Sequence, residues 1–276
     1  MAQWARRLRL MTVVAAGLLL VCTATAAPDA TDAAQRLRIT ILYDNTAFDA
    51  RLEADWGFSA LIEYGEHTIL FDTGNDGPRL LANAERLGVD LSTIEAIVLS
   101  HIHGDHVNGL YSVLRIGISP PTYVPYTFPY MFKSYARSMT EVVEVSDRME
   151  LFPGVFLTGV LSGPPYEQAV VVETAAGLVV ITGCGHPGIV RIVRRAKSLA
   201  DGDVALVVGG LHLMFHNEEE IRAIIDELRK LGVRQICPTH CTGEEAIAQF
   251  AEAFGADYVQ GGVGRVITIE GSIDSD

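Results

Sequence analysis

The feature that most constrains this chain is a group of histidines that directly follows a short apolar stretch. The apolar run at residues 94–99 predicts a buried strand, and His101, His103, Asp105 and His106 come immediately after it. Three of the eight histidines in the chain therefore lie within six residues. Neutral imidazole nitrogens and carboxylate oxygens are ligands of borderline divalent ions such as zinc. The sequence thus predicts a metal site at the end of a buried strand.

The spacing within this cluster suggests two sets of ligands. His101 and His103 are two residues apart, so they lie on the same side of an extended chain and can bind one ion together. Gly104 allows a sharp turn, after which Asp105 and His106 can point toward a second ion. We expect one or two zinc ions here, with manganese or iron as alternatives.

Five further stretches carry recognisable patterns at other places in the chain. They are residues 57–63, 70–74, 181–189, 209–213 and 238–243. The spacing His101-x-His103-x-Asp105-His106 and residues 70–74 resemble motifs of the metallo-β-lactamase superfamily. The other four stretches resemble its dihydropteroate-synthase-like branch, which is related to archaeal dihydropterin ribofuranosyl-aminobenzene phosphate synthases. The resemblance covers roughly residues 37–270.

This resemblance implies a fold and a ligand set. The fold is α/β, a four-layer αββα sandwich with helices outside two packed sheets. One ion would be held by His101, His103 and His186, and the other by Asp105, His106 and His240. Many members of the superfamily carry a bridging Asp after a glycine. Cys184 follows Gly183 here instead, so a site with one metal ion is an alternative.

The resemblance also implies catalytic roles. Zinc lowers the pKa of a bound water to about 7, so a metal-bound hydroxide can attack at neutral pH. Asp105 would orient that water and accept its proton. His212, at the end of another predicted strand, would contact substrate or donate to a developing negative charge, and the alternative is a hydrogen-bonded core histidine. We expect Asp72 to orient a ligand histidine or its own turn.

The amino-terminal residues predict export. Residues 1–27 combine three arginines, an apolar run and small residues before Ala26 and Ala27, which is typical of a cleaved signal peptide. The apolar run is too short for a comfortable bilayer span, although a retained anchor is an alternative. We expect a secreted or periplasmic protein without stable membrane insertion after cleavage. Residues 28–36 would then form a linker.

The rest of the chain, residues 37–276, predicts a single domain that acts on a small-molecule substrate. Cleavage of the signal would change the formal net charge from −13 to about −16, because it removes three arginines. Such an acidic chain disfavours nucleic acid as a partner. The aromatic-rich residues 119–150 are either a cap insertion over the site or a packed segment that closes the core. The oligomeric state stays open.

Three cysteines remain after cleavage, which is too few for a disulfide framework. Cys184 lies two residues before His186, and Cys241 is adjacent to His240. Either thiol is a metal ligand, a neighbour of the site or a packing residue.

Periodicity and capping signals predict several elements. A hairpin is expected from residues 58–64 and 67–71, and a helix from residues 78–87. Asn217 should cap a later helix, and Thr242 with Glu245 resembles a capping box.

Three functions follow from these observations. The leading hypothesis is a metal-dependent hydrolase of an ester, lactone, amide or phosphoester. The first alternative is a transferase of the dihydropterin ribofuranosyl-aminobenzene phosphate synthase type. The second is a non-catalytic metal-binding module.

Overall fold

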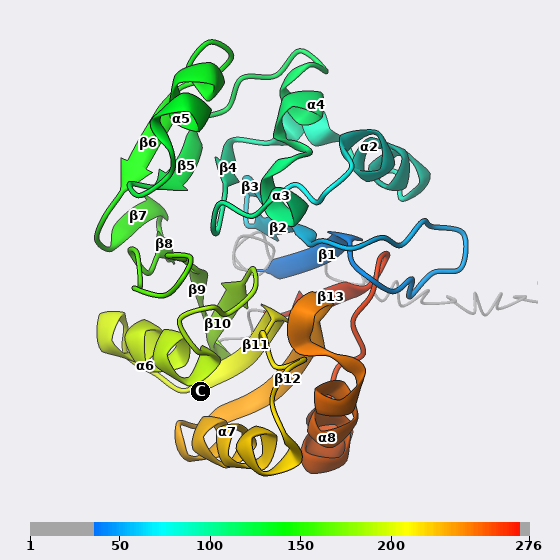
Figure 1. Ribbon diagram of the computed structural model, residues 1–276, viewed down its shortest axis with the longest axis vertical. Coiled ribbons are helices and arrows are strands. Elements are labelled where there is room, and N and C mark those ends of the chain that lie inside the picture. The colour runs from blue at the N-terminus through cyan, green and yellow to red at the C-terminus, as the bar shows by residue number, and fades with distance from the viewer. Residues whose placement is uncertain (1–35, 271–276) are drawn as a thin grey trace, which may run out of the picture.

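Two β-sheets form the centre of the computed structural model, which describes residues 36–270 (Figure 1). The predicted signal peptide and nearly all of the predicted linker lie outside the described residues. Among the helices of residues 36–270, none is long and apolar enough to cross a membrane.

The first sheet has seven strands. In spatial order they are β13 (Val266–Ile269), β1 (Leu37–Tyr43), β2 (Ser59–Tyr64), β3 (His67–Phe71), β4 (Ala96–Val98), β5 (Thr122–Pro125) and β6 (Val142–Val145). The predicted hairpin is confirmed, because β2 and β3 pair antiparallel with Tyr64 opposite His67. From β3 to β6 the strands run parallel. The carboxyl ends of β3 and β4 therefore meet at one edge.

The second sheet has six strands. In spatial order they are β12 (Val233–Thr239), β11 (Val204–Gly210), β10 (Gly177–Thr182), β9 (Val170–Thr174), β8 (Val155–Leu157) and β7 (Met149–Phe152). β10, β11 and β12 are parallel. Their carboxyl ends again share one edge of the sheet.

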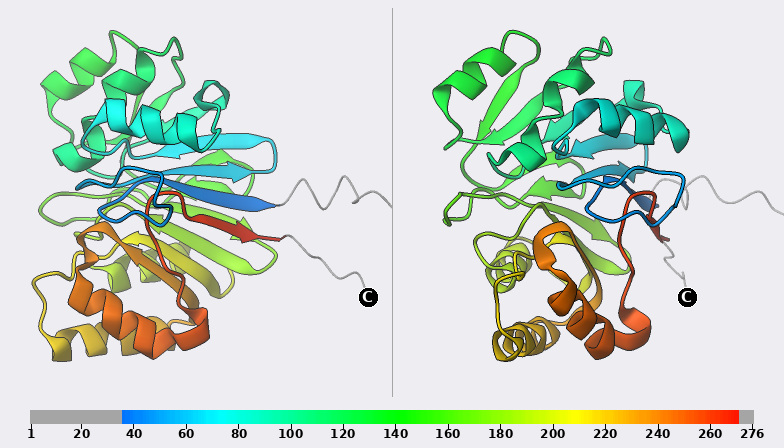
Figure 2. Two further views of the ribbon diagram at one scale, coloured as in Figure 1. Left: turned by 90° about the vertical axis from the view of Figure 1, so that its right-hand side faces the viewer. Right: turned by 45° about the vertical axis from the view of Figure 1, so that its right-hand side comes forward.

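Helices cover the outer face of each sheet, as Figure 2 shows. The first sheet carries α2 (Gly77–Arg86), α3 (Gly104–Val107), α4 (Leu110–Leu114) and α5 (Tyr130–Ala136), and the second carries α6 (Ile189–Leu199), α7 (Glu218–Lys230) and α8 (Glu244–Phe254). The predicted four-layer αββα sandwich is confirmed.

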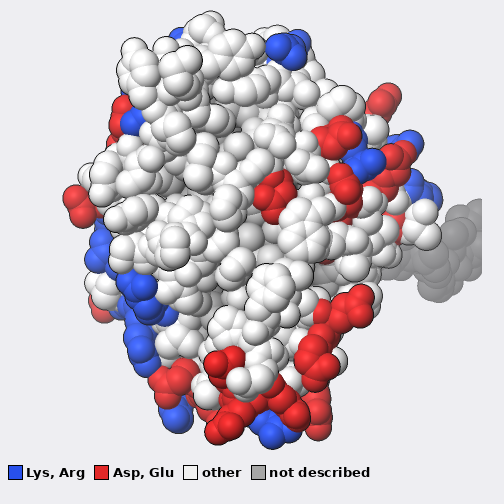
Figure 3. Space-filling model, in the orientation of Figure 1, with Lys and Arg blue, Asp and Glu red and all other residues white. Residues whose placement is uncertain are grey.

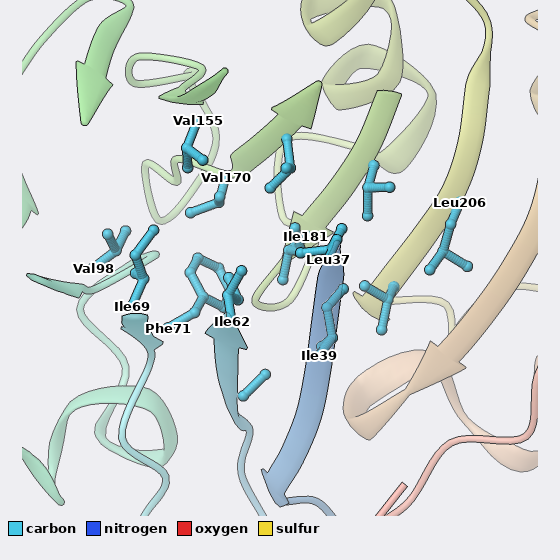
Figure 4. Packing of buried hydrophobic residues seen from close by; sticks show 14 of the residues in the cluster. Leu37, Ile39, Ile62, Ile69, Phe71, Val98, Val155, Val170, Ile181 and Leu206 are labelled. Carbon is cyan, nitrogen blue, oxygen red and sulfur yellow. The ribbon is translucent and has the colours of Figure 1, made fainter. Parts of the chain in front are cut away.

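Strand alternation explains why the apolar runs in this sequence are nearly continuous. In β3, Ile69 and Phe71 belong to the core between the sheets, while Leu70 packs in the core beneath the helices. In β10, Ile181 faces the same central core and Val180 faces the helices of the second sheet. Figure 4 shows side chains from the two sheets meeting in this central layer. A strand that is covered on both faces needs apolar residues at successive positions.

Local signals placed most helix ends correctly. α2 starts at Gly77, with Asp76 as its cap, and ends one residue before the predicted end. Asn217 and Glu220 form a capping box at the start of α7. The capping box predicted for Thr242 is wrong, because Gly243 is the cap residue of α8 and no side chain caps this helix. Thr242 instead donates to the Thr239 carbonyl and accepts from the Leu211 amide.

Residues 119–150 add two strands to the first sheet. They contribute β5 and β6, and α5 lies between these two strands in the sequence. On α5, Tyr130 and Met131 are exposed. A role of α5 in covering a bound substrate stays a prediction.

The backbones of β10 and β11 lie close together at Gly209, and the effect of a substitution there on stability tests this packing. An added Cβ at Gly209, whose φ is +123°, would lie 1.9 Å from the Thr182 carbonyl oxygen. We expect Gly209→Ala to lower the free energy of unfolding by about 2–4 kcal/mol, as measured by urea denaturation.

Gly202→Ala is the matched control. Its φ is +121°, but an added Cβ would meet no atom within 4 Å. The control should therefore lose only the backbone strain, about 1 kcal/mol. Equal losses for the two variants would contradict the packing argument.

Candidate metal centre

The predicted site residues lie at the ends of parallel strands from both sheets. His101 and His106 follow β4, His186 follows β10, His212 follows β11, and His240 follows β12. Asp72 follows β3. Its φ angle is +54°, that of His212 is +55° and that of His240 is +48°. Such backbone is uncommon for residues other than glycine, so these turns mark a functional edge.

The first predicted triad comes together in the structure. His101 Nε2 lies 3.2 Å from His103 Nδ1. The ring of His186 lies 4.7 Å from that of His101 and 4.9 Å from that of His103, between ring centroids. The buried Nε2 of His186 has no hydrogen-bond partner among the described residues. Three imidazoles therefore converge.

The second predicted triad lies beside the first. His106 Nε2 is 3.2 Å from His240 Nε2. Asp105 Oδ2 lies 3.3 Å from His240 Nε2 and 3.7 Å from His106 Nε2. The centroids of the His101 and His106 rings are only 4.2 Å apart, so the two triads are adjacent.

A buried carboxylate sets the orientation of two of these imidazoles. Asp72 accepts from Nδ1 of His106 at 2.7 Å and from the amide and hydroxyl of Ser100, each at 2.7 Å. Because the Ser100 hydroxyl donates to Asp72, it accepts from Nδ1 of His101, at 2.9 Å. Both imidazoles thus carry their proton on Nδ1 and present a lone pair on Nε2. Asp72 therefore orients His106 directly and His101 through Ser100, as expected, while the role of these histidines as metal ligands stays a prediction.

The amide side chain of Asn45 fixes the orientation and the tautomer of His240. Asn45 Nδ2 donates to the His240 carbonyl at 3.0 Å, which fixes the orientation of the amide. Asn45 Oδ1 then accepts from Nδ1 of His240 at 2.9 Å. His240 also presents its lone pair on Nε2.

These tautomers fit a bound cation. The facing Nε2 atoms of His106 and His240, 3.2 Å apart, are both acceptors and have no proton to share. Two nitrogens bound to one tetrahedral zinc lie about 3.3 Å apart, given bond lengths of 2.0–2.1 Å. The observed separation matches that value, so His106 and His240 could hold one divalent ion, which would satisfy both lone pairs.

The charge states also suit a metal. Burial, together with the neighbouring imidazoles, holds the pKa of His101 well below its usual value. Burial and the nearby His212 lower the pKa of His186 to about 3. Burial alone would raise the pKa of Asp105, but the hydrogen bond and charge of His240 and the charge of His106 lower it instead. Burial disfavours a charge on His106, but the charge and hydrogen bond of Asp72 raise its pKa, so a bound metal would have to displace any added proton from this imidazole. Neutral imidazoles and an ionised carboxylate are the forms that bind metal.

Glu167 is a supporting residue that the sequence analysis missed. It is fully buried, and its carboxylate accepts hydrogen bonds from the consecutive amides of residues 183–186 at 2.8–3.2 Å. It therefore holds the loop that carries Cys184 and His186. A charged residue directly before an apolar strand was the only sequence signal.

Trp56 and Asn45 were also missed, because they lie far from the histidine cluster in the sequence. The indole nitrogen of Trp56 donates to Asp105 Oδ2 at 2.8 Å, and its ring lies 5.0 Å from that of His240. The Trp56 side chain is partly exposed, so it borders the opening of the site.

His212 lies next to the first triad. Its ring centroid is 4.1 Å from that of His186, and its buried Nδ1 has no hydrogen-bond partner among residues 36–270. Both histidines line a pocket of about 270 Å³, together with Ile189 and Leu213. This position allows the predicted contact with substrate, which stays a prediction.

The fold and the two adjacent sets of side chains that could hold a metal ion are typical of an enzyme class in which two sheets carry a metal centre at their common edge. Residues 56–240 match the model of the metallo-beta-lactamase superfamily, and the chain belongs to this superfamily. Its members generally bind metal ions, and the chain is an enzyme of this fold.

Comparison with individual proteins gives further relatives. The 7,8-dihydropterin-6-methyl-4-(beta-D-ribofuranosyl)-aminobenzene-5'-phosphate synthase of Methanocaldococcus jannaschii is 29% identical over 83% of this chain and 95% of its own. An uncharacterized protein of the same organism is 27% identical, over 84% of this chain and 100% of its own. The predicted resemblance to the synthase branch is thus confirmed.

Solved structures agree with this assignment. Tm1679, described as a metal-dependent hydrolase of the beta-lactamase superfamily, superposes with a TM-score of 0.70 at 27% identity, covering 85% of this chain and 99% of its own. YhfI of Bacillus subtilis, at 15% identity, has a TM-score of 0.63 over 85% of this chain and 99% of its own, and it supports the fold alone.

The contacts of Asp72 predict a loss of metal affinity when its charge is removed. We expect Asp72→Asn to weaken metal binding about 10- to 100-fold, because His106 and His101 lose their fixed tautomers. Calorimetric titration of the metal-free protein would measure this. Asp226→Asn, an exposed position on α7, is the control, and an unchanged affinity in Asp72→Asn would contradict the assigned role.

Proposed function

We propose that this protein is a metal-dependent hydrolase with one or two zinc ions, acting on a small-molecule ester, lactone, amide or phosphoester. The observation that carries the proposal is the convergence of six side chains from three strand ends, those of β4, β10 and β12, into two adjacent sets. His101, His103 and His186 would hold one ion, and Asp105, His106 and His240 would hold the other. When bound, such ions lower the pKa of water and polarise the scissile bond.

The side chains around the ligands have separate tasks in this proposal. Asp105 Oδ2 accepts from the indole of Trp56 and lies beside Nε2 of His240 and of His106, where it can orient an attacking water and take up its proton. His212 lies at the pocket beside His186, where it can donate to negative charge that develops on the substrate.

The surface around the centre favours an uncharged substrate portion. In Figure 3 the middle of this face is largely free of charged side chains, while acidic and basic groups lie toward its margins. Trp56, whose indole contacts Asp105 and His240, is an exposed aromatic side chain at this centre. It supports a substrate with an apolar or aromatic group.

A transferase reaction is the second candidate, and one observation favours it. The relative from Methanocaldococcus jannaschii, which matches along 83% of this chain, is named as a synthase. The same centre would then activate a group for attack by a nucleophile other than water. Incubation with water as the only acceptor distinguishes the two reactions, because only a hydrolase releases product.

We also propose that the mature protein is secreted or periplasmic. The support is the pattern of arginines, apolar residues and small residues in residues 1–27. Amino-terminal sequencing of the protein from an exporting host would find a start near Ala27 or Pro28 if this is correct.

The role of Asp105 gives the central test of the hydrolase proposal. Purified mature protein loaded with zinc should hydrolyse at least one member of a panel of ester, lactone, phosphodiester and β-lactam substrates. Asp105→Asn should lower kcat by about 100-fold or more, since it removes a group that acts on the attacking water. Its metal content should fall less than its activity.

Mass spectrometry of bound metal, measured beside kcat, separates these effects. Asp226→Asn should retain both activity and metal. A folded, zinc-loaded protein that is inert toward the whole panel would argue against the hydrolase, and a fully active Asp105→Asn variant would rule out the role of Asp105.

A further inference from the structure

The loop after β10 carries a second kind of ligand beside His186. Cys184 is 3% exposed, and its Sγ lies 3.4 Å from Nε2 of His106. This sulfur lies within 4.8 Å of the ligand nitrogens of His101 and His186 and, on its other side, within 4.8 Å of those of His106 and His240. Cys184 is therefore common to both sets of imidazoles.

We propose that Cys184, as a thiolate, is the ligand shared by the two metal positions. The inference rests on the proposed metal-dependent function and adds a sulfur ligand to it. On metal binding the S–H bond breaks, the proton leaves to solvent and the sulfur electron pair is donated to the metal, so no oxidant is required.

The distances agree with this assignment. A zinc–sulfur bond of about 2.3 Å and a zinc–nitrogen bond of about 2.0 Å at a tetrahedral angle put sulfur and nitrogen about 3.5 Å apart. The observed 3.4 Å between Cys184 Sγ and His106 Nε2 matches that value.

The charge balance of the site gives an independent reason to expect a thiolate ligand. Asp105 is the only carboxylate that reaches the imidazole lone pairs among residues 36–270, because the nearby buried acids have other partners. Asp72 binds Ser100 and His106 Nδ1, and Glu167 binds four backbone amides. Two divalent ions beside neutral imidazoles need more negative charge than Asp105 supplies. A Cys184 thiolate supplies it at the shared position.

Cys241 has a different place in this arrangement. Its Sγ lies 3.0 Å from that of Cys184, but on the side that faces His212. It is absent from both sets of ligand atoms around the paired imidazoles in the described structure. Its sulfur also lies 3.4 Å from the Cys184 carbonyl oxygen. Burial and the Cys241 contact raise the pKa of the Cys184 thiol, so the proton would leave Cys184 only when a metal binds there.

Cobalt substitution tests this inference with a readout other than activity. A thiolate bound to Co²⁺ produces a sulfur-to-metal charge-transfer band in the near ultraviolet, which nitrogen and oxygen ligands do not. We expect this band in the wild-type protein loaded with Co²⁺. It should disappear in Cys184→Ala, with bound metal falling from about two ions per chain toward one.

Three variants make the result specific. Cys184→Asp supplies a carboxylate at the same place, so it should lack the band but retain more metal than Cys184→Ala. Cys241→Ala removes the neighbouring thiol, and Cys237→Ala removes a buried thiol outside the two ligand sets. Both of these variants should keep the band. Circular dichroism checks that each variant is folded.

The possible outcomes separate the two proposals. Bound Co²⁺ without a band in the wild-type protein, or a band that survives in Cys184→Ala, overturns the thiolate ligand and leaves the metal-dependent function standing. A band lost only in Cys241→Ala assigns the sulfur to Cys241 instead and also overturns it. A folded wild-type protein that binds no metal contradicts the proposed function itself.

Discussion

The structure depends on one electrostatic constraint: several neutral imidazoles must present lone pairs to a common centre without repelling one another. Asp72 meets much of this constraint, because one buried carboxylate fixes His106 directly and His101 through the hydroxyl of Ser100. Asn45 fixes His240 in the same way. Fixed tautomers leave acceptors that face each other, and a bound cation would satisfy both of them.

The sandwich fold makes this constraint possible. Parallel strands deliver residues to one edge of each sheet, and packing of the sheets face to face brings the two edges together. Sharp turns at these ends use strained backbone, as at His212 and His240 with positive φ angles. The central core of interdigitated aliphatic side chains holds the strands rigidly enough to maintain those turns (Figure 4).

Local sequence signals predicted a large part of this arrangement. The hairpin of β2 and β3 and the cap at Asn217 followed from turn residues and periodicity, which act over a few positions. The capping box predicted at Thr242 is wrong, because the Thr242 hydroxyl forms hydrogen bonds with the backbone of Leu211 and Thr239 instead. Glu167 and Asn45 were not predicted, since each acts on a loop distant in sequence.

The sequence by itself determined the histidine cluster at His101 to His106, the apolar strands, and the resemblance that links His186 and His240 to that cluster. Short spacing and alternation encode these features, because they depend on neighbours along the chain. Only the tertiary structure decided which nitrogen each imidazole presents and where the thiol of Cys184 lies. Those properties depend on hydrogen bonds and packing between segments up to about two hundred residues apart, which no local pattern records.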